Sequence, residues 1–324
     1  MIKERIFQIK NHKDFTDVCL EVFDYQFHNN PVYHKFCSLL DRTPDKINHY
    51  REIPFLPIEF FKSKEIISGD LLPQITFTSS GTTGSNTSKH HVTDLDIYEH
   101  SFLDAFENFY GDPKDYTILA LLPSYLERTG SSLIYMVDSL IKNSENKDSG
   151  FYLNNLKELS QKLEELDKGG KKVFLIGVSF ALLDLVEKKS LQLNNTIVME
   201  TGGMKGRRKE MIRTELHAHL KKGFGVDAIH SEYGMTELLS QAYSNGHGIF
   251  KCPAWMEILI RDPEDALSLQ PDGKTGGINV IDLANINSCS FIATQDLGKK
   301  NNDEIEILGR FDNSDLRGCN LLIL

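Results

Sequence analysis

Residues 154–180 read NNLKELSQKLEELDKGGKKVFLIGVSF, and this stretch combines two patterns that predict a helix followed by a buried strand. One helical face carries four regularly spaced leucines: Leu156, Leu159, Leu163 and Leu166. The pair Gly169-Gly170 ends the helix, and VFLIG then supplies the unbroken apolar run of a strand that is buried on both faces. Helix, glycine stop and buried strand together indicate an α/β fold.

The same alternation extends in both directions along the chain. Further runs read as strand or helix in turn: DYTILALLP (115–123), SSLIYMVDSLI (131–141), ALLDLVEKK (181–189) and TIVMETGG (196–203). Strands that alternate with helices predict parallel-rich sheets flanked by helices. Residues 14–42 read as helices, and IPFLPIEFFK (53–62), with its two prolines, reads as an irregular packed connector.

Shorter β-like runs separated by Gly, Asn and Asp turns begin near residue 250. We therefore expect a helical N-terminal segment (1–70) packed on an α/β core (71–248), with a smaller β-rich subregion and a short tail at 249–324. No linker interrupts these segments, so the sequence predicts one integrated unit.

Composition excludes several functional classes. A chain of 324 residues with 40% hydrophobic and 25% charged residues is typical of a globular protein with a sizeable core, and its net charge of −10 argues against nucleic-acid binding. Five scattered cysteines without a CxxC pair favour a reducing compartment. The charged N-terminus and the lack of a long apolar run predict a cytoplasmic protein with neither signal peptide nor membrane span.

A loop rich in glycine and hydroxyl side chains, FTSSGTTGSNTSK (77–89), follows an apolar run. Glycines let the backbone approach a ligand, and successive N–H groups, hydroxyls and one lysine can surround phosphate oxygens. The loop matches neither the Walker A pattern nor GxGxxG. From the residues alone, a phosphate site and an ordinary solvent-exposed loop both stay open.

Four further segments follow this loop in order: ETGGMKG (200–206), HSEYGMTE (230–237), ATQDLG (293–298) and GRFDNSDLRGCN (309–320). The series resembles the adenylate-forming superfamily of acyl-CoA synthetases, luciferases and peptide-synthetase adenylation domains. With YQFHNNPVYHKFC, IPFLPIEFFK, LLPSYLERTGSSLIYMV and RGCN, the chain is similar to the LuxE acyl-protein synthetases, long-chain fatty acid–protein ligases, over about residues 10–322.

This resemblance implies the fold of an adenylate-forming N-terminal domain, with the chain ending before the mobile C-terminal domain that supplies a catalytic lysine in full-length enzymes. Another group would then balance charge during adenylation. The candidates are Lys89, Lys205 and Arg128, or a group from a partner subunit.

The resemblance also implies ATP and Mg²⁺, with a role for each matched residue. The phosphate-binding set is Thr78, Ser79, Ser80, Gly81, Thr82, Thr83, Gly84 and Lys89. Tyr233 and Gly234 on one side and Gly202 and Gly203 on the other would enclose adenine, while Thr236 would bind the α-phosphate and Glu237 the magnesium ion. Asp296 and Arg310 would bind the ribose.

Plainer interpretations stand beside these roles. Tyr233 taken alone fits a core position, Glu237 fits a solvent-facing helix start, and His230 fits either substrate orientation or a satisfied buried histidine. The pairs His90-His91 and His217/His219 do not present both rings on one face, which argues against zinc. An acyl tunnel near Phe180, Leu182, Leu183 and Tyr125 is equally an ordinary core.

The resemblance implies an AMP-forming ligase that activates a fatty acid, with a long-chain acid as the expected substrate, as an acyl-adenylate. Cys319 in RGCN would accept the acyl group as a thioester, helped by nearby Arg317, and deliver it to an acyl-CoA-reductase-like or acyltransferase partner. Two alternatives stay open: an aryl- or acyl-CoA ligase of the phenylacetate–CoA ligase type, and a non-catalytic nucleotide- or acyl-binding subunit. The oligomeric state is left open.

Overall fold

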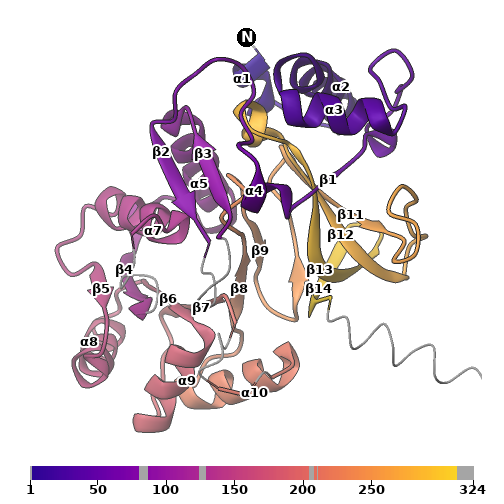
Figure 1. The fold of residues 1–324 in the computed structure, drawn as a ribbon. Helices are drawn as coiled ribbons and strands as arrows, with labels where there is room; N and C mark the ends of the chain where they lie inside the picture. The colour runs from indigo at the N-terminus through magenta and orange to yellow at the C-terminus, as the bar shows by residue number, and fades with distance from the viewer. Residues whose placement is uncertain (1, 80–86, 124–128, 204–207, 210, 312–324) are drawn as a thin grey trace, which may run out of the picture. The chain divides into compact units, whose positions relative to one another are not determined.

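The computed structural model describes residues 2–79, 87–123, 129–203, 208–209 and 211–311 (Figure 1). Contacts divide the chain into two compact units: unit 1 combines residues 1–72 with 254–324, and unit 2 is formed by residues 73–253. The three-segment division expected from the sequence stays a prediction. Among the helices of the described ranges, none is long and apolar enough to cross a bilayer.

Unit 2 is built around one sheet with the strand order β5-β4-β6-β7-β8-β9. Neighbouring strands are parallel except for the last pair, β8 and β9. The strands are β4 (Thr117–Leu121), β5 (Gly150–Tyr152), β6 (Val173–Val178), β7 (Thr196–Thr201), β8 (His230–Tyr233) and β9 (Ala242–Ser244). The parallel sheet predicted from the alternating pattern is therefore present, and every residue of β4 and β6 is buried.

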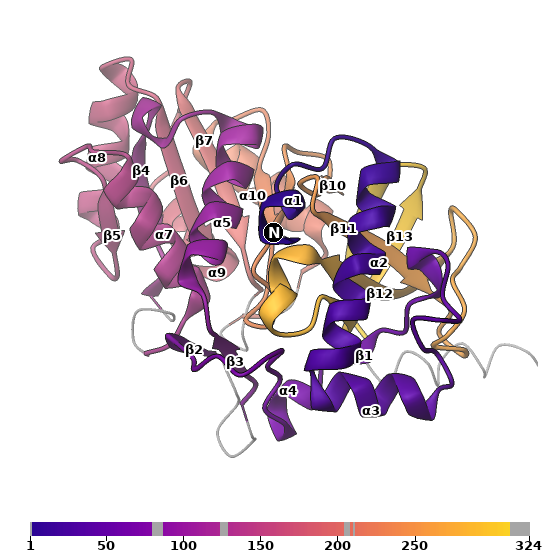
Figure 2. The ribbon, with the colours of Figure 1, turned by 90° about the horizontal axis from the view of Figure 1, so that it is seen from above.

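Helices pack on both faces of this sheet, as Figure 2 shows from above. Phe174 of β6 meets Phe106 of α5 with ring centroids 5.1 Å apart, whereas Gly177 of the same strand faces Leu182 of α9. A Cβ at Gly177 would lie only 2.6 Å from that leucine, so the strand and α9 approach more closely than a side chain would allow. The two residues are three apart, and the alternation of a strand directs them to opposite faces.

The helices of unit 2 are α5 (Leu95–Tyr110), α7 (Ser132–Asn143), α8 (Leu156–Lys168), α9 (Ser179–Lys188) and α10 (Arg213–Phe224), with the 3-10 turn η2 (Pro113–Asp115). Local signals fix their ends: the Ser131 side chain accepts a hydrogen bond from the Ile134 N–H at the start of α7, and Gly111 ends α5 at a φ of 89°. The four leucines predicted on one face of α8 are all buried. Burial of each such side chain stabilises the fold by about 1.5–3 kcal/mol.

Unit 1 contains a second, mostly antiparallel sheet in which β14, β13, β12 and β11 follow one another, while the short β1 pairs with β13 in parallel. Its strands are β1 (Leu56–Pro57), β11 (Met256–Arg261), β12 (Thr275–Asp282), β13 (Phe291–Asn301) and β14 (Glu304–Arg310). The β-rich subregion expected after residue 250 is thus present. The connector at 53–62 is less irregular than expected, because its residues Leu56–Pro57 form β1, which pairs with the distant strand β13.

Helices cover this sheet within unit 1: α1 (Ile2–Ile6), α2 (His12–Asn29), α3 (Pro31–Leu39), α4 (Phe60–Ser63) and the 3-10 turns η1 (Tyr50–Glu52) and η3 (Leu283–Asn287). Phe23 of α2 and Tyr33 of α3 each pack on Phe291 of β13, with ring centroids 6.1 Å apart. Buried Gln26 donates to the Asn285 and Ile286 carbonyls at 2.9 Å. These contacts join the N-terminal helices to the C-terminal strands as one core.

Gly223 offers a test of the close contact between α9 and α10. A Cβ at this position would lie 2.4 Å from the Cβ of Val186, which cannot swing away because it is attached to the backbone. Gly223→Ala should therefore lower the free energy of unfolding by about 1–2 kcal/mol, even after the roughly 1 kcal/mol that alanine contributes in a helix. Urea unfolding measures the change. Gly150→Ala is the matched control, because nothing lies within 4 Å of its added Cβ; equal losses in both variants would contradict the packing argument.

Candidate active site

The glycine- and hydroxyl-rich loop is carried by an antiparallel hairpin of β2 (Ile75–Thr78) and β3 (Lys89–Val92). Thr78 pairs with Lys89 at its open end. Beyond this pair, the Ser79 N–H donates to the Ser88 carbonyl at 3.1 Å, and the Ser88 N–H donates to Ser79 Oγ at 2.9 Å. These bonds close the base of the loop. Of the predicted phosphate-binding set, Ser80, Gly81, Thr82, Thr83 and Gly84 lie outside the described residues.

Gly130 supports the hairpin from the side. Its carbonyl accepts a hydrogen bond from the Thr78 N–H at 2.8 Å, and its φ of 77° favours glycine. A Cβ there would lie 3.0 Å from Thr78 Oγ1 and 3.4 Å from the Thr76 carbonyl oxygen, so there is little space for a side chain beside β2. The end of β2, from which the loop departs, is thereby fixed in position.

His90 connects this hairpin to the YGMTE segment. Its ring is 1% exposed, and Nδ1 lies 2.9 Å from the Thr236 carbonyl oxygen, which is 146 residues away in sequence. Since the carbonyl can only accept, Nδ1 carries the proton. Burial lowers the pKa of His90 to about 4, so the ring is neutral near pH 7. The structure therefore brings the two most distinctive motifs of the sequence together within unit 2.

The YGMTE segment begins at the last residue of β8. Tyr233, the last residue of the strand, packs edge-on against Phe250 of β10 (Ile249–Phe250), with ring centroids 6.3 Å apart. The next turn is tight, since the Leu238 N–H donates to the Met235 carbonyl at 3.1 Å. Glu237 is 5% exposed within this turn, whereas Thr236 is half-buried.

The glycine turn of ETGGMKG follows β7, the neighbour of β8. Gly202 has a φ of 67°, a conformation that favours glycine, and its carbonyl oxygen lies 2.8 Å from Ser179 Oγ at the start of α9. Gly203 is exposed. Because β7 and β8 are parallel, their carboxyl ends lie at one edge of the sheet, where ligands bind in open α/β sheets. Gly202, Gly203 and Tyr233–Glu237 are thus gathered at that edge.

Two glutamates near this edge have opposite electrostatic environments. Glu232 of β8 accepts a hydrogen bond from Thr201 Oγ1, and its Oε1 lies 2.4 Å from where a Cβ of Gly234 would be. Burial, with a smaller contribution from the charge of Glu200, raises the pKa of Glu232 to about 7, although the Thr201 hydrogen bond acts in the opposite direction. The carboxyl therefore titrates near neutral pH.

Glu200 of β7 is buried at 5% exposure on the other face of the sheet. Although burial opposes ionisation, the His217 hydrogen bond and the Arg213 charge hold the pKa of Glu200 below its usual range. Oε1 lies 3.5 Å from Arg213 Nε and 3.6 Å from His217 Nε2, and Ser179 Oγ donates to Oε2 at 3.0 Å. This carboxylate is charged and held from several directions.

His230 is closer to a satisfied interior histidine than to a free base. Its Nδ1 lies 3.3 Å from the Tyr110 hydroxyl, and burial lowers its pKa to about 4. The acyl-site candidates Phe180, Leu182 and Leu183 are likewise buried in the layer of α9. Tyr125, Arg128, Lys205 and Cys319 lie outside the described residues.

Asp296 and Arg310 belong to unit 1, where they are cross-strand partners on β13 and β14. Their charged groups are 4.0 Å apart, and the arginine side chain is 86% exposed. An ion pair so exposed contributes about 0–1 kcal/mol to stability. Their predicted role at a ribose stays a prediction.

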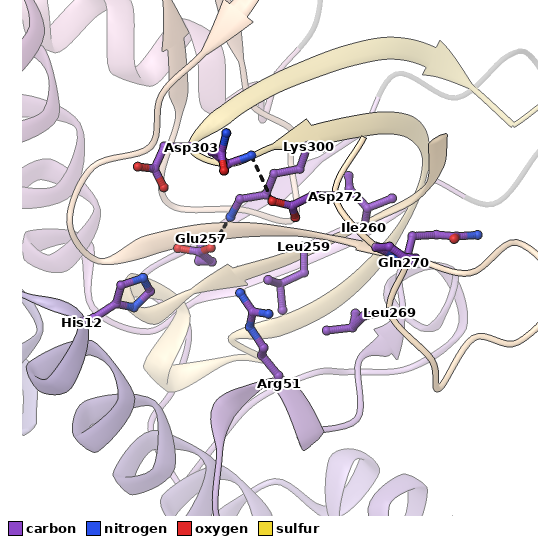
Figure 3. Close-up of a pocket in the computed structure, with 12 residues that line it drawn as sticks. His12, Arg51, Glu257, Leu259, Ile260, Leu269, Gln270, Asp272, Lys300 and Asp303 are labelled. Atoms are coloured by element: carbon purple, nitrogen blue, oxygen red, sulfur yellow. Dashed lines mark hydrogen bonds and ion pairs between the residues drawn. The ribbon is translucent and has the colours of Figure 1, made fainter. Parts of the chain in front are cut away.

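A pocket of about 300 Å³ in unit 1 is lined by none of the predicted residues (Figure 3). Lys300 reaches across it to pair with Glu257, while Asp272 accepts from the Asn302 N–H at 3.1 Å. A second pocket, of about 330 Å³ in unit 2, includes Phe180. Its acidic members Asp184 and Glu187 both bind Arg208.

Sequence reasoning missed His90, Glu200 and Arg213. From the sequence, His90 and His91 are considered only as a metal-binding pair. The signal for His90 is its alternation with Val92, because both residues lie on the buried face of β3. Its partner at Thr236 carries no local signal. Arg213 begins α10 without any motif around it.

Comparison with known proteins defines the fold. No protein-family model and no curated protein sequence matches the chain. Among solved structures, ATP-bound MatB from Rhodopseudomonas palustris superposes with a TM-score of 0.55 at 18% identity, over 72% of this chain and 47% of MatB. An open conformation of 2-hydroxyisobutyryl-CoA ligase (HCL), in complex with 2-HIB-AMP and CoA, gives a TM-score of 0.66 at 11% identity over 94% of this chain and 72% of that one.

The chain therefore has the α/β fold of the N-terminal domain of adenylate-forming enzymes, as expected, and spans about half the length of MatB.

The His90 contact leads to a first test at this site. His90→Leu should lower the free energy of unfolding by about 1–3 kcal/mol, because the partly buried Thr236 carbonyl loses its donor. His90→Asn should recover much of that loss, since the amide nitrogen of asparagine can take the place of Nδ1. Urea unfolding compares the variants. His91→Leu, on the partly exposed face of the same strand, is the control; a loss as large as that of His90→Leu would argue against a special role for the Thr236 contact.

The raised pKa of Glu232 gives a pH-dependent prediction. The folded protein binds the Glu232 proton more tightly than the unfolded chain does. The contribution of this proton to the free energy of unfolding is therefore complete below the unfolded pKa of about 4.5, and it is lost as the pH rises through about 7. Glu232→Gln stays neutral and should gain about 1–3 kcal/mol over the parent between pH 5 and pH 8.

Urea unfolding at several pH values measures this difference. Exposed Glu215→Gln is the control and should show no such trend. A Glu232→Gln difference that is flat across the range would show that Glu232 titrates normally.

Proposed function

We propose that this chain is a ligase that uses ATP to activate a carboxylic acid as an acyl-adenylate, releasing pyrophosphate. The observation that carries the proposal is the His90–Thr236 hydrogen bond, which places the loop-bearing hairpin beside the YGMTE segment in unit 2. A fold shared with MatB and HCL supports it, since those structures contain ATP and an acyl-adenylate respectively.

Each matched residue has a chemical reason to serve this reaction. The loop at 79–88 and Lys89 would hold the outer phosphates, while Thr236 would bind the α-phosphate. Tyr233 and Gly234 on one side and the Gly202–Gly203 turn on the other would enclose the adenine. Asp296 and Arg310 would bind the ribose.

Glu237 fits a magnesium-binding role. Among the described residues, no group of three or more His, Cys, Asp or Glu side chains could hold a metal ion. A magnesium ion at Glu237 would therefore need ligands from the substrate or from water as well. Mg²⁺ is commonly held by one or two carboxylates together with substrate phosphates and water. One buried carboxylate next to Thr236 suits that arrangement, and the ion would neutralise phosphate charge.

In the reaction, an oxygen of the substrate carboxylate forms a bond to the α-phosphorus. The bond from that phosphorus to the bridging oxygen breaks, and pyrophosphate leaves with the electron pair. Lys89 and the loop N–H groups would compensate the charge that develops on the leaving group. Because His90 and His230 are neutral near pH 7, neither adds charge to this step.

The second step that we propose is transfer to Cys319, as in the LuxE-like acyl-protein synthetases. Its thiolate would attack the acyl carbon, form a thioester and release AMP. A long-chain fatty acid as substrate, and a reductase-like or acyltransferase partner as the recipient, complete this proposal. Transfer to CoA is the second candidate, because the HCL structure holds CoA together with its adenylate.

Carboxylate-dependent ATP–pyrophosphate exchange tests the first step. The parent protein should exchange label with at least one acid from a panel of fatty, aryl and hydroxy acids. Glu237→Gln should lower the rate about 100-fold or more, as expected when a group that stabilises transition-state charge is removed. Glu215→Gln is the matched exposed control and should exchange normally. A parent protein that binds ATP but exchanges with no acid would indicate a binding subunit.

Intact-mass spectrometry of the same reactions resolves the second step. The parent should gain the mass of one acyl group, and Cys319→Ser should lose this adduct while retaining exchange. Labelling that survives in Cys319→Ser would overturn the role of that thiol. Release of acyl-CoA on addition of CoA, without a protein adduct, would establish the alternative.

A further inference from the structure

Arg213, the first residue of α10, stands between a buried carboxylate and a buried aromatic ring. Its Nε is 3.5 Å from Glu200 Oε1, and its guanidinium carbon is 4.9 Å from the centre of the Phe250 ring. Phe250 is fully buried, and Glu200 is 5% exposed. The guanidinium is thus held on one side by charge and on the other by a cation–π contact.

The contacts continue from Phe250 to the end of β8. The Phe250 ring meets Tyr233 edge-on, at 6.3 Å and an interplanar angle of 72°. Phe250 therefore has the guanidinium and the Tyr233 ring as neighbours, and movement of the phenylalanine would release both contacts. Aromatic pairs and partly desolvated cation–π contacts are strong enough to favour one ring orientation.

The same network reaches the glycine turn at its other end. Ser179 Oγ lies 3.0 Å from Glu200 Oε2 and 2.8 Å from the Gly202 carbonyl oxygen. Glu200 is also two residues before Gly202 on the same strand. Ser179 Oγ is therefore within hydrogen-bond distance of both Glu200 and the Gly202 carbonyl, and its single hydrogen is donated to one of them at a time. Arg213 and Phe250 connect the same carboxylate to the Tyr233 ring.

We propose that Arg213 is a positioning residue that sets the gap between Tyr233 and the Gly202–Gly203 turn for the base of the nucleotide. This inference rests on the proposed function, in which those two elements enclose adenine. In this proposal Arg213 acts through its contacts with Glu200 and Phe250. It should therefore govern how tightly the base is bound, and it should leave recognition of the phosphates unchanged.

Two ligands separate these contributions. ATP carries both the base and the phosphates, whereas inorganic tripolyphosphate carries the phosphates alone. Arg213→Met removes the charge and the planar group while keeping an unbranched side chain. We expect it to raise the Kd for ATP about tenfold, to change the Kd for tripolyphosphate less than twofold, and to raise KM for ATP with kcat nearly unchanged.

Arg213→Lys keeps the charge beside Glu200 but loses the planar guanidinium over Phe250, so its Kd for ATP should be intermediate. Lys162→Met is the matched control. Its side chain is 24% exposed against 29% for Arg213, it also pairs with a carboxylate, Asp148, and it lies on α8, which packs on β6 and α9. Both affinities should match the parent in this variant.

Calorimetry with both ligands and a thermal melt of each variant give the outcome. If Arg213→Met lowers the affinities for ATP and tripolyphosphate equally, Arg213 has a general structural role and the inference is overturned. An unchanged affinity for ATP in this variant would also overturn it. If Arg213→Met does not fold, Arg213→Lys decides by the same two affinities. Failure of the parent to bind ATP would overturn the proposed function itself, whereas parent binding with an unaffected Arg213→Lys and Arg213→Met would overturn only the positioning role.

Discussion

One hydrogen bond, from the buried, neutral ring of His90 to the Thr236 carbonyl, is the constraint on which the candidate site depends. Buried polar groups need hydrogen-bond partners, and His90, which is 1% exposed, has the Thr236 carbonyl as the partner of its Nδ1. The bond therefore fixes the distance between the base of the hydroxyl-rich loop and the turn that carries Glu237. A phosphate site assembled from these two segments depends on that distance. The hydrogen bonds between Ser79 and Ser88 close the base of the loop but do not connect it to the turn.

The parallel pairing of β7 and β8 brings the other residues of the candidate site together. Paired carboxyl ends of β7 and β8 bring the Gly202 turn next to Tyr233, and strand alternation then sorts the charged residues between faces. On one face, Glu200 is ionised and surrounded by Arg213, His217 and Ser179. On the other, Glu232 has little compensation beyond Thr201 and titrates near neutrality. One face of the sheet therefore carries a carboxylate, Glu200, whose charge is compensated, and the other carries the carboxyl of Glu232, whose charge changes near neutral pH.

Much of the architecture could be predicted from local patterns. The α8–β6 segment follows from four leucines at helical spacing and a following apolar run, and both elements form where expected. The connector at 53–62 was harder, because β1 exists only through its pairing with Ile292 and Ala293. His90 shows the same limit at the site: its burial follows from alternation with Val92, but its partner lies 146 residues away.

By itself the sequence determined the fold class, the order of helices and strands, and the motifs that mark the loop, the glycine turn and YGMTE, since each depends on the spacing of neighbouring residues. Only the tertiary structure decided which of these segments are in contact and which of their titratable side chains are charged near pH 7. Arg213, Glu200 and Phe250 are ordinary residues in the sequence; they become one network because a buried carboxylate and a buried ring both need partners, and the fold supplies them from distant segments.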